Sequence, residues 1–294
     1  MRFAVSLVVG MAVLIFWTLS PPVADATKEG DKDTIAEMTT HLSIEQVERT
    51  DIDNTAASMG YTELSAGAEW QFLLLDINHR IYDWGDNAFL GSKDPLESLT
   101  QIVPGVQYYQ KFSDTWSVWI KGVALAGFED ALSSESITYN PQVVTFYFPT
   151  QRTTLYCGVG MLYHPADTTI YPVVGVAWNM DAEKGFFGTL GFPETTLRYG
   201  FTEKFALKLD VQWDNRIYQL AEDNTVAQEG YLQIEDLLPG LHLEYKPLKN
   251  LMLSVGVRRY FDRQLTFFDQ EENELTSSEV DESWAYLLGI TYTL

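Results

Sequence analysis

Ten residues, 205 to 214, constrain the fold of this 294-residue chain more than any other stretch. Large apolar residues occupy every second position, and small, polar or charged residues occupy the positions between them: Phe205, Ala206, Leu207, Lys208, Leu209, Asp210, Val211, Gln212, Trp213 and Asp214. Successive side chains of a β-strand point to opposite faces, so one face of this segment is apolar and the other is charged. This pattern is typical of a transmembrane β-barrel strand, because lipid contacts one face and a wet lumen contacts the other.

Similar alternation recurs from Tyr61 to the C-terminus, with connections of two kinds between the segments. Tight turns are expected near Ser113, Pro165, Glu203 and Pro247, and longer connections at 82–98, 129–151, 181–185, 222–230 and 269–282. Short periplasmic turns alternate with longer extracellular loops in outer-membrane barrels. The sequence therefore predicts an all-β, antiparallel, up-and-down transmembrane β-barrel of ten strands, or of twelve if 34–47 and 143–148 are strands too. A soluble, secreted β-sandwich is the alternative fold.

Three local irregularities accompany this pattern. Apolar residues occupy even positions from Leu232 to Leu238 and odd positions from Leu241 to Tyr245, which predicts a β-bulge at residues 239–240. Arg259 and Arg263 interrupt the apolar face of residues 251–267, so we expect them beyond the membrane boundary. Pro172 predicts that its strand starts nearby, because proline is awkward in a central strand.

The N-terminus indicates export. Residues 1–26 are typical of a signal peptide, with Arg2 before an apolar run and Ala24-Asp25-Ala26 as a cleavage site. Residues 27–60 are a polar segment, open between a tail, a helix and an extra strand, and residues 61–294 form the predicted barrel. Cys157 is the only cysteine, so no internal disulfide holds this chain.

Charge and hydropathy limit the partners. The formal net charge of −22 argues against nucleic-acid binding and against adhesion to anionic lipid. After the signal peptide, no run of eighteen apolar residues marks a transmembrane helix. The expected environment is the lipid of the bacterial outer membrane.

The C-terminal segment, Trp284 to Leu294, has one face of large apolar and aromatic residues and one face of mostly small residues. Gly289 lies five residues before the last residue, Tyr292 lies two residues before it, and Leu294 is the last residue. In this spacing, the ending resembles the C-terminal insertion signal of bacterial outer-membrane barrels, with Leu in place of the usual final Phe. The resemblance implies that the barrel-insertion machinery is a partner.

A second resemblance covers Tyr171 to Gln219. Its motifs are Pro172-Val173-Val174-Gly175-Val176, Gly191-Phe192-Pro193, Leu197-Arg198-Tyr199 and the segment 204–213. This stretch resembles a family of bacterial outer-membrane, transporter-like β-barrel proteins of unknown function. The family implies a location and a shape, and it supplies no catalytic residues.

No motif for enzymatic chemistry is found. The four histidines have no H-x-x-x-H or H-E-x-x-H spacing, and no nucleophile, P-loop or dinucleotide motif is present. We therefore expect no catalytic residue, no metal site and no cofactor. A membrane-embedded hydrolase using Asp76, His79 and Asp83 is the weakest hypothesis, because solvated rim residues explain the same pattern.

The polar faces of the later strands define a predicted lumen. Its residues are Arg198, Lys208, Asp210, Gln212, Asp214, His242, Glu244, Lys246, Arg258, Tyr260 and Asp262. They predict a porin-like or transporter-like barrel that passes small solutes through a narrow polar lumen. The alternative is a structural or surface-interaction barrel in which these charges pair and plug the lumen, and in which acidic extracellular loops act.

Overall fold

The computed structural model describes residues 38–85, 88–92, 95–179 and 183–294, and the predicted signal peptide lies outside these ranges. The strands are β1 (Met38–Asp51), β2 (Ser58–Trp70), β3 (Leu73–Trp84), β4 (Ser98–Lys111), β5 (Trp116–Phe128), β6 (Ile137–Thr150), β7 (Thr153–Tyr163), β8 (Thr168–Trp178), β9 (Gly185–Phe192), β10 (Glu194–Gly200), β11 (Phe205–Gln219), β12 (Tyr231–Leu248), β13 (Leu251–Phe268), β14 (Glu274–Val280) and β15 (Ser283–Thr293). Within these ranges, no helix is long and apolar enough to cross a membrane.

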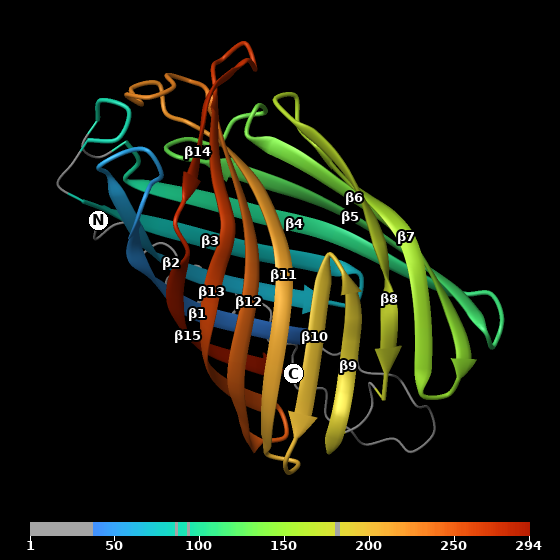
Figure 1. The fold of residues 1–294 in the computed structure, drawn as a ribbon. Helices are drawn as coiled ribbons and strands as arrows, with labels where there is room; N and C mark the ends of the chain where they lie inside the picture. The colour runs from blue at the N-terminus through green and yellow to red at the C-terminus, as the bar shows by residue number, and fades with distance from the viewer. Residues whose placement is uncertain (1–37, 86–87, 93–94, 180–182) are drawn as a thin grey trace, which may run out of the picture.

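The strands close into an antiparallel barrel (Figure 1). Each strand from β1 to β13 pairs with the next, β13 pairs with β15, and β15 pairs with β1. Fourteen strands thus form the wall, and β14 is an additional strand that pairs with the upper part of β13. The prediction of ten to twelve strands is therefore wrong, whereas the closed, all-β, antiparallel architecture is observed.

The extra strands arise where sequence signals were weak. Residues 38–51 form β1, and residues 137–150 form β6, a longer strand than the segment considered. Gln71, with φ of +52°, begins a turn between β2 and β3, although apolar residues continue at even positions through Trp70, Phe72 and Leu74. One strand was expected between the connection at 181–185 and the turn near Glu203, and the structure has a hairpin of β9 and β10 there. The last loop contains β14.

The outer surface is apolar. On β15, Trp284, Tyr286, Leu288 and Ile290 are 45–58% exposed on one face, whereas Ala285 on the other face is fully buried. At the barrel end that holds Leu294, exposed aromatic residues come from many strands and turns: Trp70, Phe72, Tyr108, Phe112, Trp116, Tyr147, Phe186, Tyr199, Phe201, Phe205 and Tyr245. An apolar band with an aromatic girdle is the exterior of a bacterial outer-membrane barrel, and we call this end periplasmic because both described termini lie there.

The predicted bulge at residues 239–240 is wrong. β11 and β12 keep an unbroken register from Phe205↔Tyr245 to Gln219↔Tyr231, so even positions of β12 face inward throughout. The apolar pattern changes phase because the upper interior is itself apolar: Leu232, Ile234 and Leu238 are at most 3% exposed.

The bulge lies instead on β13 at Asp262, where φ is +48° and the register with β12 shifts. The extra residue turns Arg263 inward, where it is 1% exposed, and leaves Asp262 exposed. Arg263 therefore does not interrupt the apolar outer face, which was the reason for expecting it beyond the membrane boundary. Arg259 remains outside and pairs with Glu282.

A contact between β5 and β11 divides the upper barrel. Gln219 pairs in parallel with Phe128, and the Glu129 N–H donates to the Gln219 carbonyl at 2.9 Å. Gly127 permits this approach, because a Cβ there would lie 2.4 Å from the Ile217 carbonyl oxygen. We call the part ringed by β11–β15 and β1–β5 the large section, and the part ringed by β5–β11 the small section.

Candidate functional site

The large section is crossed by ion pairs between opposite walls. Arg216 on β11 places Nη1 3.2 Å from Glu63 Oε2 on β2 and Nε 2.8 Å from Asp214 Oδ2. Arg80 on β3 pairs with Glu63 and places Nη2 3.8 Å from Asp214 Oδ2. Four strands separate β2 from β11 around the wall, so these contacts run through the interior. We call Glu63, Arg80, Asp214 and Arg216 the cross-lumen layer.

A second group lies beside this layer. Arg258 on β13 contacts Glu45 on β1 at 3.0 Å and Asp210 on β11 at 3.4 Å. His242 Nε2 lies 2.6 Å from Asp210 Oδ1, and the Tyr260 hydroxyl donates to Glu45 at 2.7 Å. Arg258 therefore connects β13 to β1 and to β11 through the lumen.

The charges of the two groups balance when Lys208, which pairs with Asp210, and the pair of Asp236 and Arg263 are included. The carboxylates are Glu45, Glu63, Asp210, Asp214 and Asp236, and the cations are Lys208, Arg80, Arg216, Arg258 and Arg263, with Arg263 Nε 2.8 Å from Asp236. Most of these side chains are less than one-sixth exposed. A buried charge is tolerated when it is paired, which explains why five acids and five bases coexist here.

Aromatic rings cover the ion pairs toward the extracellular end. The ring of Tyr61 lies 5.4 Å from that of Tyr82 and 6.0 Å from that of Tyr260, and Trp84 stacks between Tyr82 and Phe89. The Arg80 and Arg263 guanidiniums lie 4.8 Å and 5.6 Å from the Tyr61 ring centroid. Cation–π contacts of this kind stabilise a charge that is shielded from water. The large section is thus closed by an apolar layer above a charged one.

Some buried donors in these layers stay without a partner. Among the described residues, nothing accepts a hydrogen bond from Nη1 and Nη2 of Arg263 or from Nη1 of Arg80. The hydroxyl of Tyr61 is likewise unpartnered within that part of the chain. Such groups give the closed lumen an unused capacity to bind hydrogen-bond acceptors.

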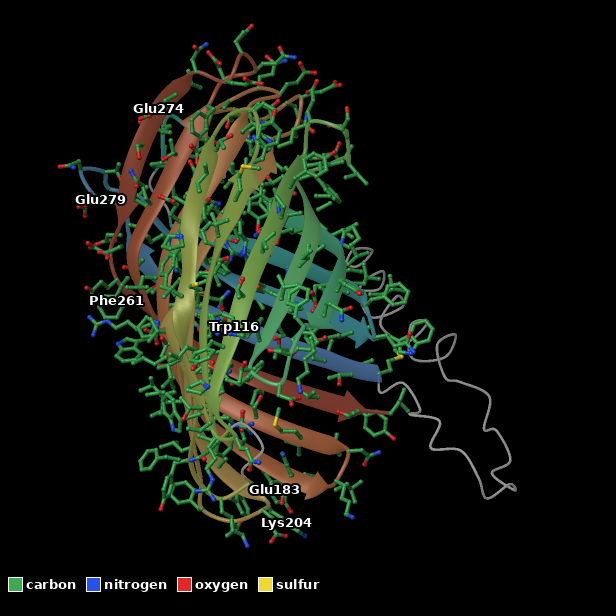
Figure 2. The ribbon with its side chains drawn as sticks, turned by 90° about the vertical axis from the view of Figure 1, so that its right-hand side faces the viewer. Trp116, Glu183, Lys204, Phe261, Glu274 and Glu279 are labelled. Atoms are coloured by element: carbon green, nitrogen blue, oxygen red, sulfur yellow. The ribbon has the colours of Figure 1, made fainter. Side chains whose placement is uncertain are left out.

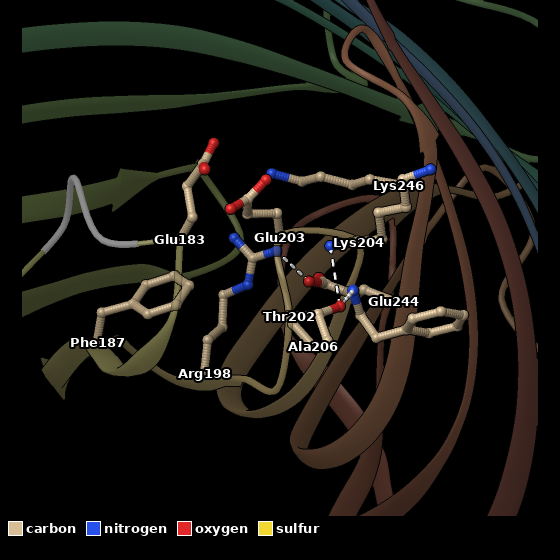
Figure 3. A pocket seen from close by; sticks show the side chains of 10 residues that line it. Glu183, Phe187, Arg198, Thr202, Glu203, Lys204, Ala206, Glu244 and Lys246 are labelled. Atoms are coloured by element: carbon tan, nitrogen blue, oxygen red, sulfur yellow. Dashed lines mark hydrogen bonds and ion pairs between the residues drawn. The ribbon is translucent and has the colours of Figure 1, made fainter.

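A smaller pocket of about 150 Å³ opens at the periplasmic end (Figure 3). Arg198 pairs there with Glu244, and Lys246 and Ala206 lie beside them. On its rim, Lys184 donates to Glu203 at 2.8 Å, and this bond lowers the pKa of Glu203. The pocket therefore presents both signs of charge to a solute that enters from the periplasm.

The structure distributes the predicted lumen residues over four places. Lys208, Asp210, Asp214, His242, Arg258 and Tyr260 belong to the paired groups across the large section. Arg198, Glu244 and Lys246 line the periplasmic pocket. Gln212 shares the inward face of β11, and Asp262 is exposed at the bulge.

Sequence reasoning missed most partners on the opposite wall. Glu63 and Arg216 occupy the polar faces of their strands, so strict alternation was a signal for both. Arg80 lies on β3, which was not separated from the strand that begins at Tyr61, and Glu45 lies on β1, in the segment 34–47 that was left open as a strand. Arg263 faces inward only because of the bulge. These five residues supply half of the paired charges.

The three residues of the hydrolase hypothesis do not meet. Asp76 lies 3.4 Å from His41, His79 bonds Thr100 at 2.9 Å, and Asp83 bonds Arg49 at 2.6 Å. Because each has a different partner, the three form no common site. In the part of the chain that the structure describes, no group of three His, Cys, Asp or Glu side chains is placed to hold a metal ion.

No family model matches the chain, and no curated protein matches it. Among solved structures, the NanC porin is 12% identical, with a TM-score of 0.38 over 86% of this chain and 100% of that chain. The KdgM porin is 10% identical, with a TM-score of 0.35 over 86% and 98%. A Pseudomonas aeruginosa FadL homologue is 9% identical, with a TM-score of 0.40 over 87% and 89%. Similarities of this size assign neither a family nor a solute to this chain.

Proposed function

We propose that this protein is an outer-membrane transporter that passes small polar solutes through the large section, with the cross-lumen layer as its gate. The observation that carries the proposal is the meeting of Arg216 and Glu63 from opposite walls inside a closed barrel. This contact blocks the lumen at the level of the cross-lumen layer, and a solute passes when the contact breaks and the apolar layer above it separates.

The charged character of the layer supports a role in transport. Replacing a buried ion pair with well-packed apolar residues is often neutral or stabilising, so such pairs are weak contributors to stability. This barrel does pack apolar residues in its upper interior, where Leu232, Phe89 and Phe267 are fully buried. The ion pairs below these apolar residues are therefore better explained as part of a path for polar solutes than as a plug that stabilises the barrel.

The layer also has the chemistry to exchange partners. A guanidinium binds carboxylates and other acceptors through several N–H groups in a fixed plane. A solute that carries carboxylate or hydroxyl groups can replace Glu63 or Asp214 at Arg216, and the free N–H groups of Arg80 and Arg263 can bind it further. Solute binding would thus weaken the contact between the walls.

The test is conductance of the purified protein in planar lipid bilayers. We expect brief, rare openings for the wild type and more frequent openings for Glu63→Gln, because Arg80 and Arg216 then share only the carboxylate of Asp214 and repel each other more strongly. Folding of each variant is checked by the mobility of unboiled and boiled samples on SDS gels.

Asp114→Asn is the matched control. Asp114 pairs with Lys111 at 3.1 Å in the exposed β4–β5 turn, so the variant loses one carboxylate charge far from the lumen. Its conductance should equal that of the wild type. If both the wild type and folded Glu63→Gln stay non-conducting, the barrel is plugged and the proposal fails.

That outcome would favour the structural or surface-interaction alternative. The β13–β14 hairpin projects beyond the barrel at the extracellular end and carries Glu274 and Glu279, opposite to Glu183 and Lys204 at the periplasmic end (Figure 2). Its acidic side chains would then be the surface that acts.

A further inference from the structure

The barrel wall is incomplete above the β9–β10 hairpin. β9 pairs with β8 only as far as Val174↔Phe192, and β10 pairs with β11 only as far as Glu194↔Gln212. Above that level, the backbone of β8 pairs only with β7, and the backbone of residues 214–218 of β11 pairs only with β12, within the part of the chain that the structure describes. In Figure 1, the hairpin ends well below the upper ends of β8 and β11.

Pro172 fits this arrangement. It lies inside β8, so the prediction that the strand starts near it is wrong. A proline is tolerated in a strand that has a neighbour on one side only, and this half of β8 is such an edge.

Above the β9–β10 hairpin, the described residues of β8 and β11 do not pair with each other, and the β7–β8 hairpin overlaps β11 instead. Asn215 and Ile217 share the outward face of β11 with Leu207 and Leu209, yet they are only 8% and 5% exposed, against 36–42% for the two leucines. Ala166, in the β7–β8 turn, packs against the cluster that contains Ile217. The β7–β8 hairpin therefore covers the outer face of β11 and β12, and we call this region the overlap.

Side chains alone fasten the hairpin tip to β12. Gln233 Nε2 donates to Asp167 Oδ2 at 2.9 Å, and the rings of His164 and Tyr231 lie 4.9 Å apart, edge to face. Separation of the overlap breaks these contacts and leaves every strand pairing intact. Opening here costs much less than opening a ladder of backbone hydrogen bonds.

Aromatic rings fill the lower corner of the overlap. Trp213 lies 5.4 Å from Tyr171 and 5.6 Å from Phe192, between centroids. The Tyr171 hydroxyl donates to Asn140 and accepts from Gln142, at 2.9 Å and 2.8 Å, which fixes its ring. The interior behind them is apolar and aromatic: Trp119, Leu125, Val144, Phe146, Tyr156, Leu162 and Val173.

We propose that the overlap is a lateral opening, through which small uncharged aromatic or apolar molecules pass between the small section and the membrane. The lower corner of the overlap carries aromatic rings and amide groups, and Asp167 lies at the hairpin tip, whereas the ion pairs across the lumen lie in the large section. Transfer of an apolar solute to the charged large section is unfavourable, whereas transfer to these aromatic rings is favourable. The route is independent of the gate proposed for polar solutes.

The experiment closes the overlap with a covalent bridge. Asp167→Cys and Gln233→Cys are combined with Cys157→Ser, because Cys157 is exposed, and a short bis-maleimide joins the two new thiols. Uptake of N-phenyl-1-naphthylamine, an uncharged aromatic amine that fluoresces in lipid, is followed in cells that express the protein in their outer membrane. We expect uptake above that of cells lacking the protein, and its loss after bridging.

Two controls define the outcome. Bis-maleimide treatment of Cys157→Ser alone should leave uptake unchanged, and the bridged protein should keep the conductance of its unbridged form for ions. Uptake that persists in fully bridged protein, or that never exceeds the level of cells lacking the protein, overturns the proposal. Glu63→Gln is expected to change ion conductance and not dye uptake, so failure of one route is distinguishable from failure of the other.

Discussion

Arg216 on β11 and Glu63 on β2 are joined across the lumen, with Nη1 of the arginine 3.2 Å from Oε2 of the glutamate. Glu63 also binds Arg80, and Arg216 also binds Asp214, so each partner holds a second charge in place. The pair therefore links two distant parts of the wall and sets the charge of the layer between them. Changes at either residue should alter both stability and gating.

Arg216→Met should destabilise the folded barrel by about 3–5 kcal/mol, because Glu63 and Asp214 lose a buried partner. The measurement is urea unfolding in detergent, followed by intrinsic fluorescence. The double variant Glu63→Gln, Arg216→Met should recover part of the loss, since fewer unpaired charges remain. Equal stability of wild type and single variant would mean that the two groups are not paired.

Gly127→Val should weaken the contact between β5 and β11. A Cβ at residue 127 would lie 2.4 Å from a backbone oxygen of Ile217, and a backbone atom cannot move aside as a flexible side chain can. We expect a lower unfolding temperature on SDS gels. Gly122→Val is the control, because the nearest atom to a Cβ there is 4.0 Å away. An unchanged Gly127→Val protein would contradict the contact.

Acid should loosen the β7–β8 turn through His164. The Ala166 N–H donates to His164 Nδ1 at 3.1 Å, and burial lowers the pKa of this imidazole below its ordinary 6.5. A lowered pKa means that the folded turn disfavours the charged ring, so its stabilisation is present above pH 6.5 and is lost as the pH falls through the lowered pKa.

The measurement is the unfolding temperature of wild type and His164→Gln between about pH 7.5 and pH 5. The wild type should lose more stability on acidification than the variant, which has no imidazole to protonate. Parallel curves would show that His164 does not contribute to the pH dependence.

The two faces of β15 should respond differently to charge. Leu288 is 58% exposed on the outer face, whereas Leu287 faces inward and pairs in register with Glu45. Leu288→Arg should destabilise the barrel in lipid vesicles by about 2–4 kcal/mol, because lipid does not solvate the charge. Leu287→Arg should cost less, since the carboxylate of Glu45 lies nearby. The opposite order would reverse the assignment of inside and outside.

Tyr292→Ala should slow assembly in cells if the ending is an insertion signal. We expect less folded protein in the outer membrane but unchanged spontaneous refolding in detergent, because only the former uses the insertion machinery. Tyr245→Ala, at the same end of the barrel, is the control. Equal assembly of both variants would argue against a signal that includes Gly289, Tyr292 and Leu294.

The lipid-facing and inward faces of the lower half of β11 followed from alternation alone. From Phe205 to Trp213, a large apolar residue occupies every second position because lipid contacts that face along the strand. The residues between them, which include Lys208 and Asp210, lie on the opposite face, where these two form an ion pair. Alternation carries no information about strand number where a turn leaves its phase unchanged, and the turn at Gln71 is such a case.

Sequence by itself determined that this chain builds an all-β wall with an apolar exterior, because each strand carries the pattern locally. Only the tertiary structure decided which charges meet. Glu63 and Arg216 are 153 residues apart, and they meet because the ring closes and β5 approaches β11 at Gly127. The pair of Arg263 and Asp236 depends in turn on the bulge that directs Arg263 inward. A pairing across the lumen depends on the positions of all fourteen strands, which no single segment specifies.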